Sequence, residues 1–295
     1  MGTVPDEELA GYKVETDLTK SLAHKPDAVV IANPTALHLD IAIPSAEAGC
    51  HLLLEKPISN DLNRIADLQS SIQRGGGKVL VGFQFRFHPG LQKLKTLLED
   101  KTVGEPVSFR AHWGEFLPDW HPWEDYRQGY SARSDLGGGV ILTLCHPFDY
   151  LRWLFGEVAG VWGISAKRSK FVMDVEDTAE IGIAFKSGLI GSVHLDYIQR
   201  PARHQLEIIG TEGTLFWDNA DGIARYFQAG KNEWQEYPPQ PGFNRNLLFI
   251  EEMKHFMEIV QRDLEPCCTL EDGIKSLEIA IAVKSSASSK KYVQF

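Results

Sequence analysis

The chain has 295 residues, of which 43% are hydrophobic, and a formal net charge of -10, a composition typical of a globular protein long enough for two modest domains. The acidic balance argues against nucleic acid as a partner, because a negative surface repels phosphates, and no apolar run approaches the ~20 residues that a membrane span needs. The four cysteines (Cys50, Cys145, Cys267 and Cys268) form no CxxC pair and the charged N-terminus is unlike a signal peptide, so we expect free thiols and a cytoplasmic protein.

The first part of the chain alternates predicted helices and strands. Asp17 is expected to cap a short helix that runs through Leu22. Apolar runs bounded by proline or glycine predict buried strands at residues 28–32, 51–54 and 78–82. Apolar positions at helical spacing predict the helices between them, at residues 36–48 and from residue 60 or 61 to about 74. This rhythm predicts right-handed crossovers and a parallel, Rossmann-type sheet over residues 1–88.

The remainder, residues 89–295, has a different pattern. A strand is predicted at 105–115, a helix from Val140 to Phe155, and two closing helices at 245–262 and 270–288. Between them lie closely spaced strand-like runs, at residues 158–166, 178–186, 189–197, 204–210, 213–217 and 223–228. Such spacing predicts an α+β domain with a large open, mainly antiparallel sheet, whose uncovered face favours a homo-oligomer.

Polar residues follow three of the predicted parallel strands where each strand ends. They are Asn33-Pro34-Thr35, Glu55-Lys56-Pro57 and Gln84-Phe85-Arg86. Ligands of open parallel sheets bind beyond the carboxyl ends of the strands, so this convergence indicates a site. Lys56 is expected to reach into the crevice, where an ammonium can polarise a hydroxyl or a carbonyl. The alternative for Lys56 is a solvated loop lysine.

A second group of candidate residues surrounds the predicted helix 140–155. The triplet Gly137-Gly138-Gly139 allows close approach of the backbone to a ligand or to the other domain. His146 and Asp149 are three residues apart, so they share one face of the helix. A histidine near a carboxylate is a suitable proton acceptor at neutral pH, and the alternative is a core histidine hydrogen-bonded to Asp149.

Aromatic residues are concentrated between Trp113 and Tyr130. Aromatic rings stack on sugars but also pack against sheets and at oligomer contacts, so both interpretations stay open. The candidates for substrate contact in this segment are Trp120, Trp123, Tyr126 and Arg127.

A similar cluster of Tyr197, Arg200 and Arg203 follows a later predicted strand. Its arginines would bind an anionic group bidentately or pair with surface acids. The histidines lack the tight spacing of zinc sites, so no metal site is expected.

Several segments together resemble the Gfo/Idh/MocA oxidoreductases, the group of glucose-fructose oxidoreductase and inositol dehydrogenase. The matching segments are Ala32–Thr35 with His38, Ala48–Pro57, Gly82–Pro89, Gly137–Gly139 with His146–Asp149, Glu176–Thr178 and Gly210–Thr214. The resemblance implies an NAD(P)-dependent enzyme that transfers a hydride between the nicotinamide and a hydroxyl-bearing carbon of a sugar, a sugar derivative or a cyclic polyol.

The resemblance also implies roles for individual residues. Lys56 would lie beside the nicotinamide and the reacting hydroxyl, His146 would be the general acid/base, and the Lys56-Pro57 bond would be cis. The cofactor crevice would be lined by Asn33, Pro34, His38, Glu55, Lys56 and Gln84. The expected substrate-binding residues are Arg86, Trp120, Trp123, Tyr126, Arg127, Asp149 and Tyr197.

Two departures from the family pattern stand out. Leu142 or Thr143 holds the place of an acidic residue that usually precedes the catalytic histidine by one helical turn. The sequence also contains no GxGxxG strand-loop-helix, so we expect an incomplete nucleotide-binding domain with an open sheet edge. Three explanations for the missing segment stay open. The gene model starts late, the chain is a natural short form that binds the cofactor weakly or not at all, or a partner subunit covers the open sheet edge. Alternative functions are a non-catalytic carbohydrate-binding relative that has lost its cofactor, or an NAD-using glycosidase-like enzyme.

Overall fold

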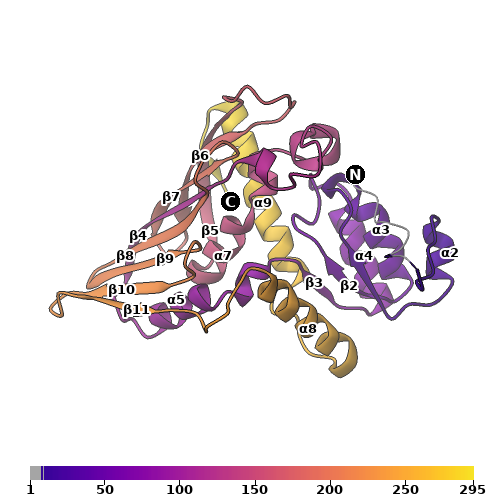
Figure 1. Ribbon diagram of the computed structural model, residues 1–295, viewed down its shortest axis with the longest axis horizontal. Helices are drawn as coiled ribbons and strands as arrows, with labels where there is room; N and C mark the ends of the chain where they lie inside the picture. Colours follow the sequence, from indigo (N-terminus) through magenta and orange to yellow (C-terminus); the bar gives the residue numbers. More distant parts are fainter. Residues whose placement is uncertain (1–7, 9) are drawn as a thin grey trace.

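The computed structural model describes residue 8 and residues 10–295. Residues 1–7 and 9 of the expected first domain lie outside the described part of the chain. A small parallel sheet and a large open sheet form the two parts of the structure, with the long helix α9 (Leu270–Ser289) between them (Figure 1). None of the described helices is both long and apolar enough to cross a membrane.

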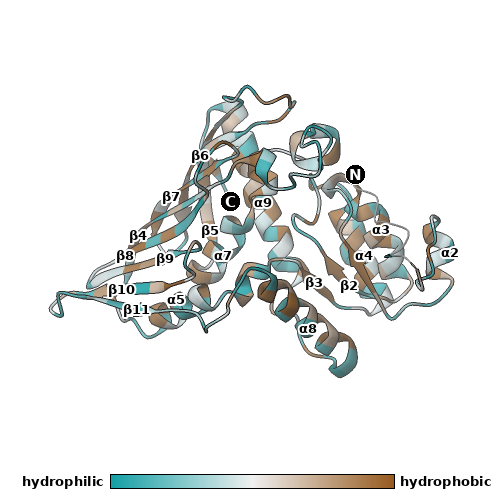
Figure 2. Cartoon of the chain, in the orientation of Figure 1, coloured by the Kyte–Doolittle hydropathy of each residue, from teal (hydrophilic) through white to brown (hydrophobic). Residues whose placement is uncertain are grey.

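The small sheet has three parallel strands in the order β1-β2-β3, as expected. These are β1 (Ala28–Ile31), β2 (His51–Leu54) and β3 (Val79–Val81). The connecting helices α3 (His38–Glu47) and α4 (Ile65–Gly75) pack against each other, and α2 (Leu18–Leu22) precedes the sheet with Asp17 as its N-cap. Figure 2 shows hydrophobic residues along β2 and β3, which are buried from both sides.

The outer edge of β1 is open in the described part of the chain. β1 pairs only with β2 there, and the side chain of Val30 on β1 is 51% exposed. An apolar strand edge of this kind is normally paired or covered in a folded protein.

Helix α4 begins at Ile65, four residues later than the later of the two predicted starts. The Asp61 carboxylate accepts hydrogen bonds from the backbone and side-chain nitrogens of Asn63, at 2.7 and 3.0 Å, and so closes a turn. Arg64 then adopts a left-handed conformation with φ 61°. Helical geometry therefore starts only at Ile65.

The large sheet has nine strands in the order β11-β10-β9-β8-β4-β7-β6-β5-β12. All neighbours are antiparallel except the central pair β4-β7, which is parallel. The strands β11 and β12 were not predicted from the sequence. The nine strands are β4 (Pro106–Gly114), β5 (Val158–Ala166), β6 (Thr178–Phe185), β7 (Ile190–Asp196), β8 (Arg203–Gly210), β9 (Gly213–Asp218), β10 (Ala224–Gln228), β11 (Trp234–Tyr237) and β12 (Val293–Gln294).

The predicted helix 140–155 is divided into α6 (Val140–Thr143) and α7 (His146–Phe155). Leu144 separates them with φ -94° and ψ 41°. The physical cause is Pro147, which has no N–H and cannot bond to the Thr143 carbonyl, so the helical ladder stops there. The break places His146 at the first turn of a new helix.

Helix α9 holds the two parts of the structure together. It starts at a capping box of Thr269 and Asp272, and it packs on β5, α7 and β3. A Cβ added at Gly273 would lie 2.8 Å from Ile58 and 2.9 Å from Val81, so glycine allows α9 to approach the small sheet this closely. The remaining helices, α5 (Pro89–Glu99) and α8 (Asn246–Arg262), pack near the 3₁₀ turn η2 (Gln84–Phe87).

Candidate active site

A cavity of about 760 Å³ lies where the small sheet meets the second part of the chain. Glu55 and Lys56 come from the carboxyl end of β2, and Gln84 follows β3. The second part contributes side chains from several elements, among them Trp113, Trp120, Tyr130, Thr143, His146, Arg200, Arg245 and Phe249. The cavity therefore occupies the edge of the parallel sheet at which the sequence indicated a site.

Lys56 extends from the end of β2 to the second part of the chain. Its Nζ donates a hydrogen bond to the Thr143 carbonyl, 2.9 Å away, and the Lys56-Pro57 bond is cis, as expected. Burial alone would lower the pKa of Lys56, but acidic groups around it, the Tyr130 phenol first among them, raise that pKa above its ordinary value. The side chain is therefore a protonated hydrogen-bond donor at neutral pH.

His146 lines the same cavity from the start of α7. The residue is 1% exposed, and its ring packs edge-on against Phe83 and Phe85. Burial lowers the pKa of His146 well below 6.5, and the positive charge of Lys56 lowers it further. The imidazole is therefore neutral at pH 7, and its buried Nδ1 has no hydrogen-bond partner among the described residues. A neutral imidazole beside an ammonium is suited to accept a proton.

Two carboxyl groups lie close to Lys56. Glu55 is adjacent to it in the chain, and burial raises the pKa of Glu55 although the Lys56 charge opposes this. Glu252, on α8, is 3% exposed, and burial together with the charge of Glu55 raises the pKa of Glu252 to about 8. Sequence reasoning missed Glu252. The sequence feature that could have revealed Glu252 is an acidic residue at a position of α8 whose helical neighbours on the same face are apolar. The other buried residues of that face are Leu248, Phe256 and Ile259.

The expected cofactor residues divide into two groups. Glu55, Lys56 and Gln84 line the cavity, whereas Asn33, Pro34 and His38 do not. His38 is buried, and its ring nitrogens lie 2.9 Å from the carbonyls of Pro57 and Asn33. His38 thus connects the turn after β1 to the turn that carries Lys56. It positions these turns rather than facing the cavity.

The aromatic segment lines the cavity mostly through residues other than the expected substrate contacts, namely Trp113, Phe116, His121 and Tyr130. Trp120 lines the cavity, but Trp123 is 77% exposed outside it. The Tyr126 hydroxyl accepts a hydrogen bond from the Val172 backbone, and Arg127 pairs with its neighbour Asp125.

Tyr197 packs behind the cavity rather than in it. It is fully buried, with its ring edge-on to Trp120 and its hydroxyl 3.4 Å from the Ser131 carbonyl. These contacts make Tyr197 a support for the cavity wall.

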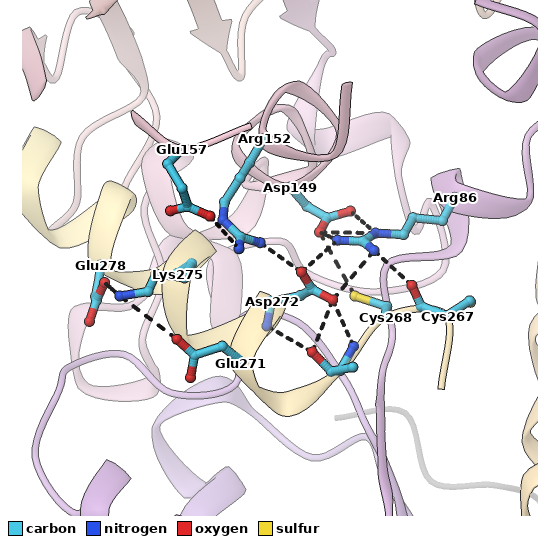
Figure 3. Close-up of polar contacts among 11 residues, drawn as sticks. Arg86, Asp149, Arg152, Glu157, Cys267, Cys268, Glu271, Asp272, Lys275 and Glu278 are labelled. Atoms are coloured by element: carbon cyan, nitrogen blue, oxygen red, sulfur yellow. Dashed lines mark hydrogen bonds and ion pairs between the residues drawn. The ribbon is translucent and has the colours of Figure 1, made fainter. Parts of the chain in front are cut away.

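Arg86 and Asp149, both expected to bind substrate, pair with each other away from the cavity (Figure 3). The Arg86 guanidinium lies 2.7 Å from Asp149 and 3.3 Å from Asp272, and it donates to the Cys267 carbonyl at 2.7 Å. Arg152 lies 2.6 Å from the same Asp272. This buried cluster joins η2, α7 and α9, so a structural role explains these residues better than substrate contact.

The fold and the cavity define a class of protein: a two-part α/β protein that brings an ammonium and a neutral imidazole together at the ends of parallel strands. Residues 7–83 match the model of an oxidoreductase family with an NAD-binding Rossmann fold, and residues 91–216 match the GFO/IDH/MocA C-terminal domain. The chain belongs to the Gfo/Idh/MocA family of oxidoreductases. It is accordingly an NAD(P)-dependent oxidoreductase by family.

Named relatives cover most of the chain. An uncharacterized oxidoreductase of Bacillus subtilis, YrbE, is 28% identical over 90% of this chain and 78% of its own length. Myo-inositol 2-dehydrogenase of Thermotoga maritima is 27% identical over 91% of this chain and 79% of its own length. The structure of levoglucosan dehydrogenase with NADH and levoglucosan superposes with a TM-score of 0.87 at 21% identity, covering 98% of this chain and 87% of that one. At that identity the superposition shows the shared fold.

The residues present fit the nicotinamide end of a dinucleotide. Lys56, Gln84 and His146 face the cavity at the carboxyl ends of the strands, and the buried Oδ1 of Asn33, after β1, lacks a hydrogen-bond partner in the described part of the chain. Among the described residues, no strand of the small sheet is followed by a GxGxxG turn that leads into a helix, the usual pyrophosphate site. The described residues therefore fit the nicotinamide, which is the reacting end of the cofactor.

Proposed function

We propose that this chain oxidises a hydroxyl-bearing carbon of a sugar, a sugar derivative or a cyclic polyol, or catalyses the reverse reduction, with NAD or NADP as cofactor. The observation that carries the proposal is the shared cavity of a protonated Lys56 and a neutral His146. The named activities of the inositol and levoglucosan dehydrogenases support this class of substrate over a non-catalytic carbohydrate-binding role.

The two residues divide the chemistry between them. When bound, the oxidised nicotinamide supplies the acceptor for the hydride that leaves the carbinol carbon. His146 takes the hydroxyl proton as the C–O bond becomes a carbonyl. Lys56 donates a hydrogen bond to the oxygen and stabilises the negative charge that develops on it. In the reverse direction His146 returns the proton.

Substitution of these residues tests the assignment. The wild-type protein is screened with myo-inositol, levoglucosan and common hexoses for reduction of NAD⁺ or NADP⁺. Lys56→Met and His146→Asn are expected to lower kcat by about a hundredfold or more, the usual loss of a general acid/base or an electrostatic stabiliser. The exposed residues Lys254 and His24 provide controls, and K254M and H24N are expected to keep full activity. Full activity of K56M or H146N would remove that residue from the mechanism.

The arginines of the cavity favour a substrate that carries an anionic substituent. Arg200 lies over the Phe116 ring at 3.8 Å and Arg245 over the Phe249 ring at 5.9 Å. Neither arginine has an ion-pair partner among the described residues, although Glu115 and Asp119 line the same cavity. Free guanidinium groups in a binding cavity are suited to carboxylates and phosphates. A sugar acid is therefore the preferred form of the proposed substrate.

A matched pair of substrates tests this preference. D-glucuronate is expected to give a higher kcat/KM than D-glucose, and Arg245→Met is expected to lower the value for the acid by about tenfold to a hundredfold while little changing that for the neutral sugar. Equal effects of R245M on both substrates would contradict the anion preference without affecting the roles of Lys56 and His146.

We also propose a cytoplasmic homo-oligomer. All four cysteines are free, which suits a reducing compartment. Trp162, Ile164 and Ile190 are 42%, 54% and 60% exposed on strands of the large sheet, which favours cover by a second copy. Light scattering tests the oligomer, and a monomer at micromolar concentration would contradict it.

A further inference from the structure

Two histidines and a carboxylate meet on the face of the large sheet turned away from its helices. His112 on β4 is directly opposite His194 on the parallel neighbour β7, and the two rings stack with centroids 4.5 Å apart. Asp196 follows two residues after His194, so its side chain is on the same face of the strand. One ligand atom from each of the three residues lies within 4.8 Å of the other two.

A glycine leaves room for the oxygen atoms of this cluster. Gly114 on β4 is opposite Asp196, and a Cβ at Gly114 would collide with both Asp196 Oδ2 and Gln199 Oε1. The two oxygens therefore converge over the Gly114 Cα. Gln199 Oε1 is also 2.5 Å from a ring nitrogen of His112, Nε2. Two nitrogen and two oxygen donors thus surround one small space.

Neighbouring groups hold these donors in position. Asp196 Oδ1 accepts hydrogen bonds from the backbone nitrogens of Ile198 and Gln199, at 2.6 and 2.7 Å, which directs Oδ2 toward His194 Nε2 at 3.0 Å. The other nitrogen of His194, Nδ1, lies 2.6 Å from Glu180 Oε1. A histidine whose far nitrogen bonds to a carboxylate is the usual arrangement of a metal-binding imidazole, because that bond fixes the ring and its tautomer.

We propose that His112, His194, Asp196 and Gln199 bind a divalent transition-metal ion such as Zn²⁺. Two imidazoles with one carboxylate suit Zn²⁺ or its chemical relatives, whereas Mg²⁺ and Ca²⁺ prefer oxygen ligands alone. The competing interpretation is an ion-pair cluster in which a protonated His194 lies between Glu180 and Asp196. The two interpretations differ in whether a metal displaces that proton.

The position of the site gives the metal a structural task. Gln199 lines the wall of the active-site cavity, as do Arg200, Pro201 and Ala202, which follow it directly. A bound ion would connect the ends of β4 and β7 to this loop without touching the reacting groups. The proposal therefore stands whatever substrate the cavity takes.

Cobalt provides a direct probe because tetrahedral Co²⁺ has intense visible absorption bands. The chelator-treated full-length protein is titrated with Co²⁺ while its visible spectrum and stoichiometry are followed. We expect one tightly bound equivalent with tetrahedral bands, displaced by Zn²⁺. His112→Asn and His194→Asn are expected to weaken binding by about tenfold to a hundredfold or more. His24→Asn removes an exposed histidine outside both the cluster and the cavity and is expected to leave Co²⁺ binding unchanged.

Two further variants keep the test decisive if a histidine variant misfolds. Gln199→Ala removes one donor from a loop, and Gly114→Ala fills the space over which the oxygens converge. Both are expected to weaken Co²⁺ binding. The proposal is overturned if the wild-type protein binds no stoichiometric Co²⁺, or if folded H112N, H194N and Q199A all bind it as the wild type does.

Discussion

The Lys56 ammonium donates its hydrogen bond to a backbone carbonyl, that of Thr143, which the helix itself cannot use. In an uninterrupted helix this carbonyl would accept from residue 147, but Pro147 has no N–H. The same proline starts a new helix at His146. Pro147 thus leaves the Thr143 carbonyl free to accept from Lys56 and places His146 at the start of α7.

The first prediction concerns Pro147 itself. Pro147→Ala restores an N–H that competes for the Thr143 carbonyl and favours a continuous helix from 140 to 155. We expect kcat to fall about tenfold or more, because small displacements of reacting groups are costly, with little loss of stability. Steady-state kinetics and thermal unfolding measure the two effects. Pro89→Ala, at the first turn of α5, is the matched control, and an equal effect there would contradict the role of Pro147.

The second prediction follows from the buried carboxyl of Glu252. Folding raises the pKa of Glu252 from 4.5 to about 8, so between these values the folded state holds a proton that the unfolded chain has lost. The contribution of this proton to the free energy of unfolding is therefore fully present below pH 4.5 and is lost as the pH rises through 8. Glu252→Gln removes the titration, so the wild type is expected to lose about 2 kcal/mol more than E252Q between about pH 6 and 8.

Urea unfolding at a series of pH values measures this slope. Glu251→Gln, on the exposed side of the same helix, is the control and is expected to keep the wild-type slope. A wild type and an E252Q variant with parallel pH dependences would show that Glu252 is ionised in the folded protein at neutral pH.

The third prediction tests the placement of Asp149. Asp149→Asn leaves the buried Arg86 without its closest carboxylate, and the expected loss in the free energy of unfolding is about 3–5 kcal/mol. Asp125→Asn removes an exposed ion pair with Arg127 and is expected to change nothing measurable. If D149N were as stable as the wild type but raised the KM for the substrate, substrate contact would be the correct interpretation.

The fourth prediction is the pH dependence of oxidation. Burial and the Lys56 charge hold the pKa of His146 well below 6.5, so the imidazole stays a proton acceptor into the acidic range. We expect kcat/KM for oxidation to be constant from neutral pH down past 6.5 and to fall only at lower pH. An acidic limb at or above pH 6.5 that vanished in His146→Asn would place the His146 pKa in its ordinary range.

Local patterns in the sequence predicted most of the fold. The apolar runs at 51–54 and 158–166 coincide with β2 and β5, and the Asp17 cap was also predicted correctly. The short edge strands β11 and β12 were missed, and the errors in helix bounds occur where one side chain overrides periodicity, as Asp61 does before α4 and Pro147 does between α6 and α7. Both effects could have been predicted from the sequence, because aspartate favours turns and proline interrupts helices.

Parts of the site could not be read from the sequence because they depend on long-range pairing. His112 and His194 meet only because β4 and β7 are parallel neighbours in one register. Arg86 and Asp149 were expected to face substrate, but their mutual pairing depends on how η2 packs against α7. Glu252 was detectable as an acid in an apolar helix stripe, but its proximity to Glu55 was not.

Deuterium transfer tests the central claim most directly. A sugar or polyol that proves to be a substrate is deuterated at its carbinol carbon and incubated with the wild-type protein and the oxidised cofactor. The account predicts deuterium at C4 of the nicotinamide, in one stereochemical position, with transfer strongly reduced in Lys56→Met and His146→Asn. Product formation without deuterium in the nicotinamide, or undiminished transfer in both variants, would contradict hydride transfer at this cavity.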